Sequence, residues 1–229
     1  MTQWPRLLER AIAGFEALEK QGQPPPYWEM GGGTALMIQL QHRVSKDIDI
    51  FIDDPQYLPI LSPRLAGESI WDTEAYDEAA NYLKLRYQEG EIDFIVAGPI
   101  SDLKAIKTQL SEDPTFGMRS HEVRLEHTVE IALKKMHYRG SQLKVRDIFD
   151  ISVIHSVSAT LLIDCLHLVS PKKQEILDRL DRIEEGYFEL ELAELDYFPK
   201  WEATAKSSLQ TMRMIAAEIP DPNPAAALR

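Results

Sequence analysis

The chain has 229 residues, of which 44% are hydrophobic and 27% are charged, a composition typical of a globular protein with a substantial core. Its 37 Asp and Glu residues outnumber its 25 Lys and Arg residues, giving a formal net charge of −12. This balance argues against non-specific coating of nucleic acid, which needs a broad basic surface to neutralise phosphates. A single cysteine, Cys165, cannot form an internal disulfide and indicates a reducing, cytoplasmic environment.

The first half of the chain alternates helical and strand patterns. Apolar residues at helical spacing predict an amphipathic helix over residues 5–20, followed by a connector rich in Gly and Pro. Alternating apolar residues bounded by turn signals predict short strands. The expected strands are 27–30, 46–52, 82–88 and 91–97, and a helix over 35–41 follows a run of glycines. The last two strands flank Glu89-Gly90, which predicts a hairpin.

From His121 onward the pattern becomes helical. The expected helices are 122–138, 145–157, 171–185 and 203–218, with a tail over 220–229. The most apolar stretch, 152–170, is interrupted by polar residues, so we interpret it as a buried helix and not as a membrane span. The sequence therefore predicts an α+β protein. Residues 1–120 would form a small mixed β-sheet with flanking helices, and residues 121–229 a helical subdomain.

Two carboxylates, Asp47 and Asp49, are two residues apart on a predicted strand, so their side chains should project from the same face. Like charges held this close repel one another unless a cation bridges them. Mg²⁺ takes oxygen ligands and is usually shared between one or two carboxylates and substrate phosphates. The pair therefore indicates a metal site for phosphate chemistry, although two acids facing solvent on a half-exposed strand would give the same pattern.

A third acid on a neighbouring strand would complete a two-metal site suited to in-line attack on a phosphate. Asp93 is our candidate, because it interrupts an apolar run and would be costly to bury without a metal or another cation beside it. Glu91 lies on the same predicted face and is the alternative.

A glycine loop precedes the carboxylate pair. Gly31, Gly32 and Gly33, then Thr34, lie between a predicted strand and a predicted helix. Glycines allow close approach of the backbone, and amides at a helix N-terminus bind anions. A tight turn alone would also explain the loop. Its position one short helix before Asp47 favours a site that brings a triphosphate from the loop to the metal.

Two sequence blocks in this order resemble a known family. The first consists of GGTAL at 32–36, HR at 42–43 and SKDIDIF at 45–51. The second consists of EIALKKMH at 130–137, Arg139 and RDIFDI at 146–151. Together they resemble the nucleotidyltransferases of the AbiEii/AbiGii toxin family, part of the polymerase-β-like nucleotidyltransferase superfamily, which includes the MenT toxins. The resemblance implies a nucleotidyltransferase-like fold, with the helical subdomain completing the active-site cleft.

The resemblance also implies roles for individual residues. Asp47 and Asp49 would bind the catalytic Mg²⁺ or Mn²⁺, and Lys135 would neutralise the triphosphate. Asp147 would position or activate the acceptor, and Asp93 as third metal ligand rests mainly on the strand argument. The residues expected to bind nucleotide are Gly32, Gly33, Thr34, Arg43, Lys46 and Lys135, and those expected to bind the acceptor are Arg139 and Arg146.

A basic segment agrees with an anionic acceptor. Residues 134–146 contain five Lys and Arg residues and no acid, in a chain that is otherwise acidic. The segment is either a confined basic channel or a solvated helix face. A surface pair between Asp147 and Lys144, three residues earlier, is likewise the structural alternative to a catalytic role for Asp147.

These observations predict a cytoplasmic enzyme that moves a nucleoside monophosphate from an NTP to an acceptor and has no membrane partner. The resemblance implies a toxin of a toxin–antitoxin or phage-defence system, with RNA, in particular the 3′ end of tRNA, as acceptor and an antitoxin encoded nearby. Three alternatives stay open: a protein-modifying nucleotidyltransferase, a kinase that transfers the γ-phosphate, and a non-catalytic nucleotide-binding module.

Overall fold

The computed structural model describes residues 3–66, 68–73 and 75–222 of the chain. The chain divides into two compact units, and its path passes between them several times. Unit 1 comprises Met1–Ile38, Ser45–Gly98 and Lys104–Glu126, and unit 2 comprises Gln39–Val44, Pro99–Leu103 and His127–Arg229. Residues 223–229 of the expected tail lie outside the described residues.

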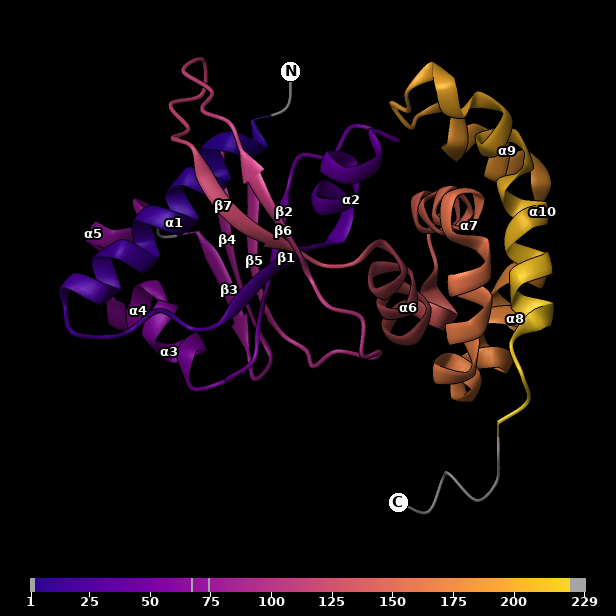
Figure 1. Cartoon of the computed structure of the whole chain (residues 1–229), viewed down its shortest axis with the longest axis horizontal. Coiled ribbons are helices and arrows are strands. Elements are labelled where there is room, and N and C mark those ends of the chain that lie inside the picture. The colour runs from indigo at the N-terminus through magenta and orange to yellow at the C-terminus, as the bar shows by residue number, and fades with distance from the viewer. Residues whose placement is uncertain (1–2, 67, 74, 223–229) are drawn as a thin grey trace. The chain divides into compact units, whose positions relative to one another are not determined.

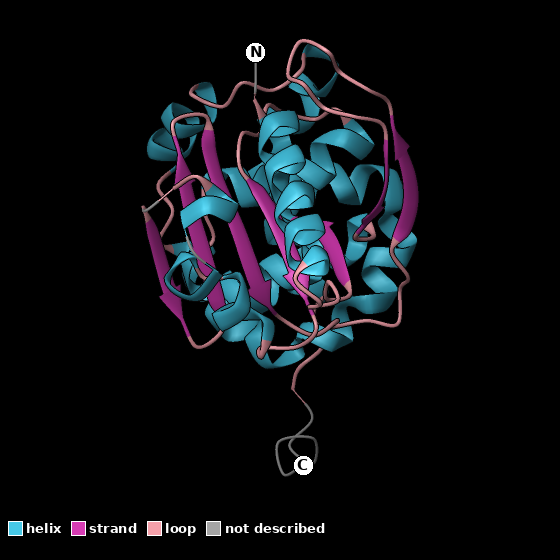
Figure 2. Ribbon diagram, turned by 90° about the vertical axis from the view of Figure 1, so that its left-hand side faces the viewer, coloured by secondary structure: helices cyan, strands magenta, loops and turns pink. Residues whose placement is uncertain are grey.

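Within the described residues, unit 1 is built on a seven-stranded mixed sheet of order β3-β4-β5-β2-β1-β7-β6, drawn in magenta in Figure 2. The pairs β2–β5 and β1–β7 are parallel, and the other neighbours are antiparallel. The strands are β1 (Trp28–Gly31), β2 (Ile48–Ile52), β3 (Tyr76–Ala79), β4 (Tyr82–Tyr87), β5 (Gly90–Val96), β6 (Ile106–Leu110) and β7 (His121–Leu125). The helices that begin in this unit are α1 (Trp4–Lys20), α2 (Gly32–Leu40), α3 (Tyr57–Leu61), α4 (Pro63–Ala66) and α5 (Glu68–Trp71).

The core of unit 1 lies between α1 and the central strands (Figure 1). Apolar residues of α1 recur at three- and four-residue spacing, so one face of the helix is buried against the sheet. Phe15 stacks on Trp28 and makes an edge contact with Phe94, at ring-centroid distances of 5.5 and 5.8 Å. Gly14 leaves room for the buried ring of Trp71, because a Cβ there would lie 3.0 Å from Trp71 Cζ2 and closer to other ring atoms.

Unit 2 is a helical bundle in which α7 packs against α6 and α10 (Figure 1). Its helices are α6 (Thr128–Arg139), η1 (Gly140–Gln142), α7 (Val145–Cys165), η2 (Leu166–Lys172), α8 (Lys173–Asp181), α9 (Glu185–Ala193), η3 (Pro199–Trp201) and α10 (Glu202–Glu218). Val145–Asp181 is long and apolar enough to cross a membrane by length and composition alone. Its backbone departs from helical geometry at Ser158, and its first turns bury two ionised aspartates, Asp147 and Asp150. Within the expected stretch 152–170, Ser152, Val153, Ile154, Leu162, Leu166 and Val169 are buried and the other residues are half-buried or exposed, so the expectation of a buried helix is confirmed only in part.

The expected α+β class, with a mixed sheet, flanking helices and a helical C-terminal part, is confirmed. The hairpin about Glu89-Gly90 and the helix over 203–218 are also confirmed, to within one or two residues at the ends. The expected strand 46–52 begins later, at Ile48, so Asp47 precedes β2. The expected helix 145–157 continues to Cys165. The expected helix 171–185 is interrupted: it contains the end of η2, then α8, then a non-helical break at 182–184 before α9 starts at Glu185.

The expectation of helix from residue 122 is wrong for the first residues. His121–Leu125 forms β7, with Val123 and Leu125 buried and their neighbours more exposed, which is the alternation of a strand. The helix starts only at Thr128, where the His127 side chain accepts the Val129 N–H at 3.2 Å as an N-cap. The strands β3 and β6 were not predicted because they are mostly exposed and lack a clear apolar alternation, and the helices α3–α5 were not predicted because four or five residues are too few to show a helical period.

Candidate active site

A row of charged residues crosses the sheet of unit 1. In the strand register, Gly31 of β1 is opposite Asp49 of β2, Asp49 is opposite Asp93 of β5, and Asp93 is opposite Lys84 of β4. Directly opposed residues point to the same face of a sheet. The neighbours of both aspartates in the chain are fully buried on the other face, so Asp49 and Asp93 lie together on the face turned away from the aromatic core.

Asp93 is held by one carboxylate oxygen only. Its Oδ2 accepts from Lys84 Nζ at 2.9 Å, whereas its Oδ1 is buried without a hydrogen-bond partner. Burial raises the pKa of Asp93 to about 6, with the nearby charge of Asp49 adding to the effect and the Lys84 bond opposing it. The ion pair raises the pKa of Lys84 despite its partial burial, so Lys84 is a cation. The two pKa shifts are consistent with one another, because burial destabilises the charged form of Asp93 by more than the hydrogen bond from Lys84 stabilises it.

Asp47 takes a different position from the one expected of a strand residue. Its Oδ1 accepts from the backbone N–H of Glu91 at 3.0 Å, and its carbonyl oxygen accepts from the Thr34 hydroxyl. Among the described residues, no group of three or more His, Cys, Asp or Glu side chains is arranged to hold a metal ion. The structure therefore brings together two of the three expected acids, Asp49 and Asp93, and Asp47 lies two residues before Asp49 in the chain.

The glycine loop is shaped around Asp49. Gly32 has φ +64°, and a Cβ at this position would lie 2.5 Å from Asp49 Cγ and 3.0 Å from its Cβ. At Gly31 a Cβ would lie 2.5 Å from the Phe51 ring and 2.7 Å from Glu126 Cδ. A side chain at Gly32 would therefore meet Asp49, and one at Gly31 would meet Phe51 and Glu126, so neither position leaves room for a Cβ. Gly33 follows in the first turn of α2, and Thr34 is buried.

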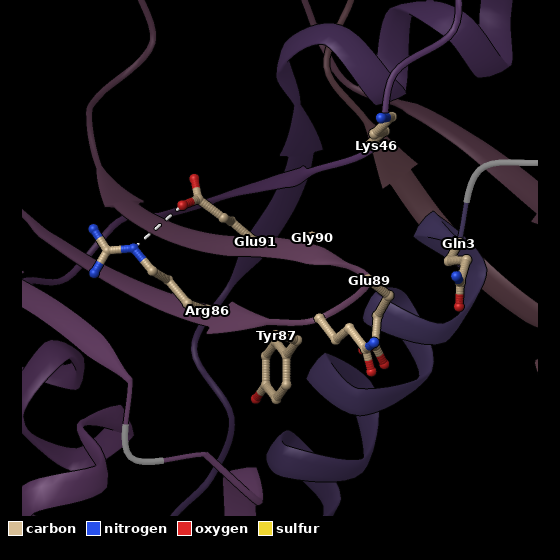
Figure 3. A pocket seen from close by; sticks show the side chains of 8 residues that line it. Gln3, Lys46, Arg86, Tyr87, Glu89, Gly90 and Glu91 are labelled. Atoms are coloured by element: carbon tan, nitrogen blue, oxygen red, sulfur yellow. Dashed lines mark ion pairs between the residues drawn. The ribbon is translucent and has the colours of Figure 1, made fainter.

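Lys46 is exposed and lines a cavity of about 360 Å³ next to the hairpin of β4 and β5 (Figure 3). The other lining residues are Gln3, Arg86, Tyr87, Gln88, Glu89, Gly90 and Glu91. Arg86 pairs with Glu91 at 3.3 Å, and the Glu91 backbone N–H is the group that binds Asp47. The cavity therefore adjoins the strand ends that carry the expected acids, and it has two cationic side chains, the exposed Lys46 and Arg86, which pairs with Glu91.

Unit 2 contains a buried network of ion pairs centred on Asp150. This fully buried carboxylate accepts from Arg43 through Nε at 2.7 Å and Nη2 at 2.9 Å, and from His42 Nε2 at 2.8 Å. Lys135 Nζ lies 3.0 Å from Asp150 Oδ2, the oxygen that also accepts from Arg43 Nη2. Burial raises the pKa of Asp150, but the charges of Arg43 and Lys135 outweigh it and hold the pKa well below its ordinary value.

Asp147 connects this network to the protein surface. Its Oδ1 accepts from Lys135 Nζ at 2.7 Å and from Arg139 Nη1 at 2.9 Å, and its Oδ2 accepts from the Lys144 backbone N–H at 3.2 Å. Burial raises the pKa of Asp147, but the charges of Lys135 and Arg139 lower it by a larger amount, so the pKa lies below the ordinary value. An ionised carboxylate with three donors orients its cations and is a poor proton acceptor at neutral pH.

The remaining expected residues differ in exposure. Arg43 is buried by its bidentate contact with Asp150, so it belongs to the network and not to an exposed phosphate-binding surface. Arg139 is about two-fifths exposed, and Arg146 is exposed. Lys135 is buried, so this part of the basic segment is not a solvated helix face. The proposed pair between Asp147 and Lys144 is replaced by the contact with the Lys144 backbone.

Sequence reasoning missed Lys84 and the role of Glu130. Glu130 accepts from the backbone N–H groups of Ile100 and Ser101 at 2.7 and 3.0 Å and from the Ser101 hydroxyl at 2.6 Å. It thereby fixes the segment that follows β5 to α6 within unit 2. In the sequence, the signal for Glu130 was an acid next to the apolar residues of a predicted helix. Lys84 could be found only from the strand register.

Comparison with known proteins identifies the family. A family model described as "Nucleotidyl transferase AbiEii toxin, Type IV TA system" matches residues 16–228. The chain belongs to this family. It is accordingly a nucleotidyltransferase of the AbiEii toxin type, associated with type IV toxin–antitoxin systems. The family resemblance and the nucleotidyltransferase activity that the sequence blocks predicted are confirmed.

The solved structure of MenT4 supports the same fold. MenT4, a nucleotidyltransferase toxin from Mycobacterium tuberculosis H37Rv, is similar with a TM-score of 0.56 and 14% identity, over 98% of this chain and 85% of the MenT4 chain. The antibiotic-resistance factor ANT(2'')-Ia matches with a TM-score of 0.43 and 14% identity, over 73% of this chain and 91% of that chain. No curated protein sequence matched the AbiEii-type chain.

Proposed function

We propose that this AbiEii-type enzyme transfers a nucleoside monophosphate from an NTP to RNA, with the 3′ end of tRNA as acceptor. In this reaction an acceptor hydroxyl oxygen forms a bond to the α-phosphorus, the bond from that phosphorus to the β-phosphate oxygen breaks, and pyrophosphate leaves. The observation that supports the proposal best is the in-register pair Asp49 and Asp93 next to a glycine loop with no room for a side chain.

The carboxylate pair fits a divalent cation. Asp93 offers a buried oxygen without a hydrogen-bond partner, and Asp49 lies directly opposite on the neighbouring strand. Mg²⁺ is commonly held by one or two carboxylates together with substrate phosphates, so a third protein ligand is not required. Asp49 and Asp93 would hold Mg²⁺ or Mn²⁺, with Asp47 as the flanking acid. When bound, the cation supplies Lewis-acid neutralisation of charge on the phosphates.

The glycine loop and Lys46 would bind the nucleotide. Gly32 and Gly33 present backbone amides at the start of α2, where the helix dipole favours an anion. Thr34 supports the loop through its bond to the Asp47 carbonyl, which ties the helix to the strand that carries the acids. Lys46, exposed at the cavity beside the hairpin, would contact the nucleotide phosphates.

The cations of unit 2 would serve the same reaction. Lys135 would neutralise phosphate charge, with Asp147 and Asp150 holding its ammonium in place, because both carboxylates lie within 3.0 Å of it. Asp147 then acts by orienting Lys135 and Arg139. The exposed Arg146 and the partly exposed Arg139 would bind the phosphates of the RNA acceptor.

The family match supports a proposal on the cellular role. We propose a cytoplasmic toxin whose modification of RNA stops growth and whose effect is opposed by an antitoxin encoded nearby. The lone cysteine and the acidic composition agree with this compartment. A confined set of cations suits a protein of net charge −12 that binds one defined RNA end.

The test uses the intact protein with Mg²⁺ and each of the four α-³²P-labelled NTPs, with and without total cellular RNA. The variants are Asp49→Asn and, as a matched control, Asp53→Asn, an exposed acid just after the same strand. We expect label on RNA in the wild type and in Asp53→Asn, and at least a hundredfold less in Asp49→Asn. RNase sensitivity and size identify tRNA as the labelled species.

Two outcomes would contradict the proposal. Label that resists RNase and disappears with protease would assign the activity to protein modification. Equal labelling by Asp49→Asn and Asp53→Asn would remove the carboxylate pair from the active site.

A further inference from the structure

Lys84 sits at the end of the charged row described above. It is opposite Asp93 in the register of β4 and β5, and its Nζ lies 2.9 Å from Asp93 Oδ2 and 2.6 Å from Glu91 Oε2. Its side chain is about a quarter exposed, so the ammonium is partly shielded from solvent. Lys84, together with Arg86 on the other oxygen of Glu91, thus neutralises part of a cluster that contains Glu91, Asp93 and Asp49.

The two carboxylate oxygens of Asp93 have different surroundings. Oδ2 is occupied by the lysine, and the buried Oδ1 has no partner. A divalent cation between Asp49 and Asp93 would therefore find Oδ1 unoccupied, whereas it would share Oδ2 with the lysine. The positive charge of Lys84 next to the same carboxylate also opposes the arrival of a second cation.

We propose that Lys84 is a positioning residue and built-in counter-ion of the Asp49–Asp93 pair, which holds Asp93 in place and weakens the binding of a free divalent cation. The inference rests on the proposed metal role of this pair. Without a nucleotide, the lysine supplies the charge that a metal would otherwise supply. The site then favours a metal that arrives with the triphosphate, because the phosphates bring the additional oxygen ligands and negative charge.

The experiment measures binding of Mn²⁺ alone, without nucleotide, by the electron paramagnetic resonance signal of free Mn²⁺. It compares the wild type with Lys84→Met, Lys84→Arg and the control Lys107→Met, which removes an exposed lysine paired with Glu122 on strands of the same sheet. We expect Lys84→Met to bind Mn²⁺ about tenfold more tightly, because a repulsive charge at a few ångströms is removed. Lys84→Arg and Lys107→Met should bind as the wild type does.

Unchanged or weaker Mn²⁺ binding by Lys84→Met would overturn the proposal, provided that its circular dichroism and unfolding midpoint match the wild type. If Lys84→Met does not fold, Lys84→Gln gives the same test with a polar side chain. Asp49→Asn, alone and combined with Lys84→Met, separates the existence of the metal site from the role of Lys84. Loss of Mn²⁺ binding in both Asp49→Asn proteins supports the metal site, so an inert Lys84→Met would then refute the lysine's role alone. Binding unaffected by Asp49→Asn would refute the site itself.

Discussion

Replacement of Gly32 by alanine tests whether the glycine loop exists to make room for Asp49. The added Cβ would lie 2.5 Å from Asp49 Cγ and 3.0 Å from its Cβ, so the carboxylate must move. The backbone has φ +64°, where an L-residue costs about 1–2 kcal/mol. Alanine also reduces the conformational entropy of the unfolded chain, which stabilises the folded protein by about 0.4–1 kcal/mol. The net backbone cost is then about 1 kcal/mol.

Gly22 provides a matched control for the backbone cost. It has φ +80°, and a Cβ at Gly22 would meet nothing within 4 Å. Gly22→Ala should therefore lose only about 1 kcal/mol of unfolding free energy. Gly32→Ala should lose a further 1–3 kcal/mol or so from the forced contact. The difference between the two variants isolates the clash with Asp49.

The two variants should separate further in activity. A displacement of about 1 Å at a reacting centre can cost about a hundredfold in rate. We expect Gly32→Ala to transfer nucleotide at least a hundredfold more slowly than Gly22→Ala, with weaker Mn²⁺ binding, measured at a urea concentration and temperature where both are folded. Equal transfer rates in the two variants would refute the view that Gly32 keeps Asp49 in place.

Three further variants test the packing, the buried network and the RNA contact. Gly14→Ala should lower the free energy of unfolding by about 1–3 kcal/mol in urea melts, because its Cβ would overlap the buried Trp71 ring, and unchanged stability would contradict this packing. Asp150 has a pKa held below its unfolded value, so its stabilisation is complete above about pH 4 and falls as the pH drops through the folded pKa. At pH 7, Asp150→Asn should be about 3–5 kcal/mol less stable than the wild type. In urea melts from pH 7 to 3, this variant should lose less stability on acidification than the wild type does. The control Asp164→Asn, at an exposed position of α7, should follow the wild type. Arg146→Ala should raise the KM for RNA, leave the KM for NTP unchanged and reduce the salt dependence of RNA binding by about one phosphate contact; an unchanged KM for RNA would remove Arg146 from the acceptor site.

The local arrangement of the acids was only partly predictable from the sequence. Asp93 was found because an acid inside an apolar strand needs a partner, and the structure places it opposite Asp49. Asp47 was expected on the strand, yet β2 begins one residue later and the Glu91 N–H binds the Asp47 carboxylate. Spacing along one strand does not specify where pairing with the next strand starts, so this difference could not be predicted.

The partners of the cations were the least predictable part. Lys84 meets Asp93 only because the hairpin register places them opposite, and Arg43 meets Asp150 across more than a hundred residues of sequence. A motif predicts that Arg43, Lys135 and Asp147 matter but does not identify the carboxylate that each cation contacts. The strand β7 was missed for a related reason, since five residues of alternation next to a strong helix pattern give a weak local signal.

The most direct test of nucleotidyl transfer to RNA follows the fate of both ends of the triphosphate in one reaction. The wild-type protein is incubated with RNA, Mg²⁺ and the active NTP, labelled in parallel at the α- or the γ-phosphate, and the RNA and the released phosphates are separated. We predict that the α-label appears in RNA and the γ-label in pyrophosphate, in equal amounts, and that both are lost in Asp49→Asn. The γ-label in RNA, with no pyrophosphate released, would contradict the account and assign a phosphoryl transfer instead.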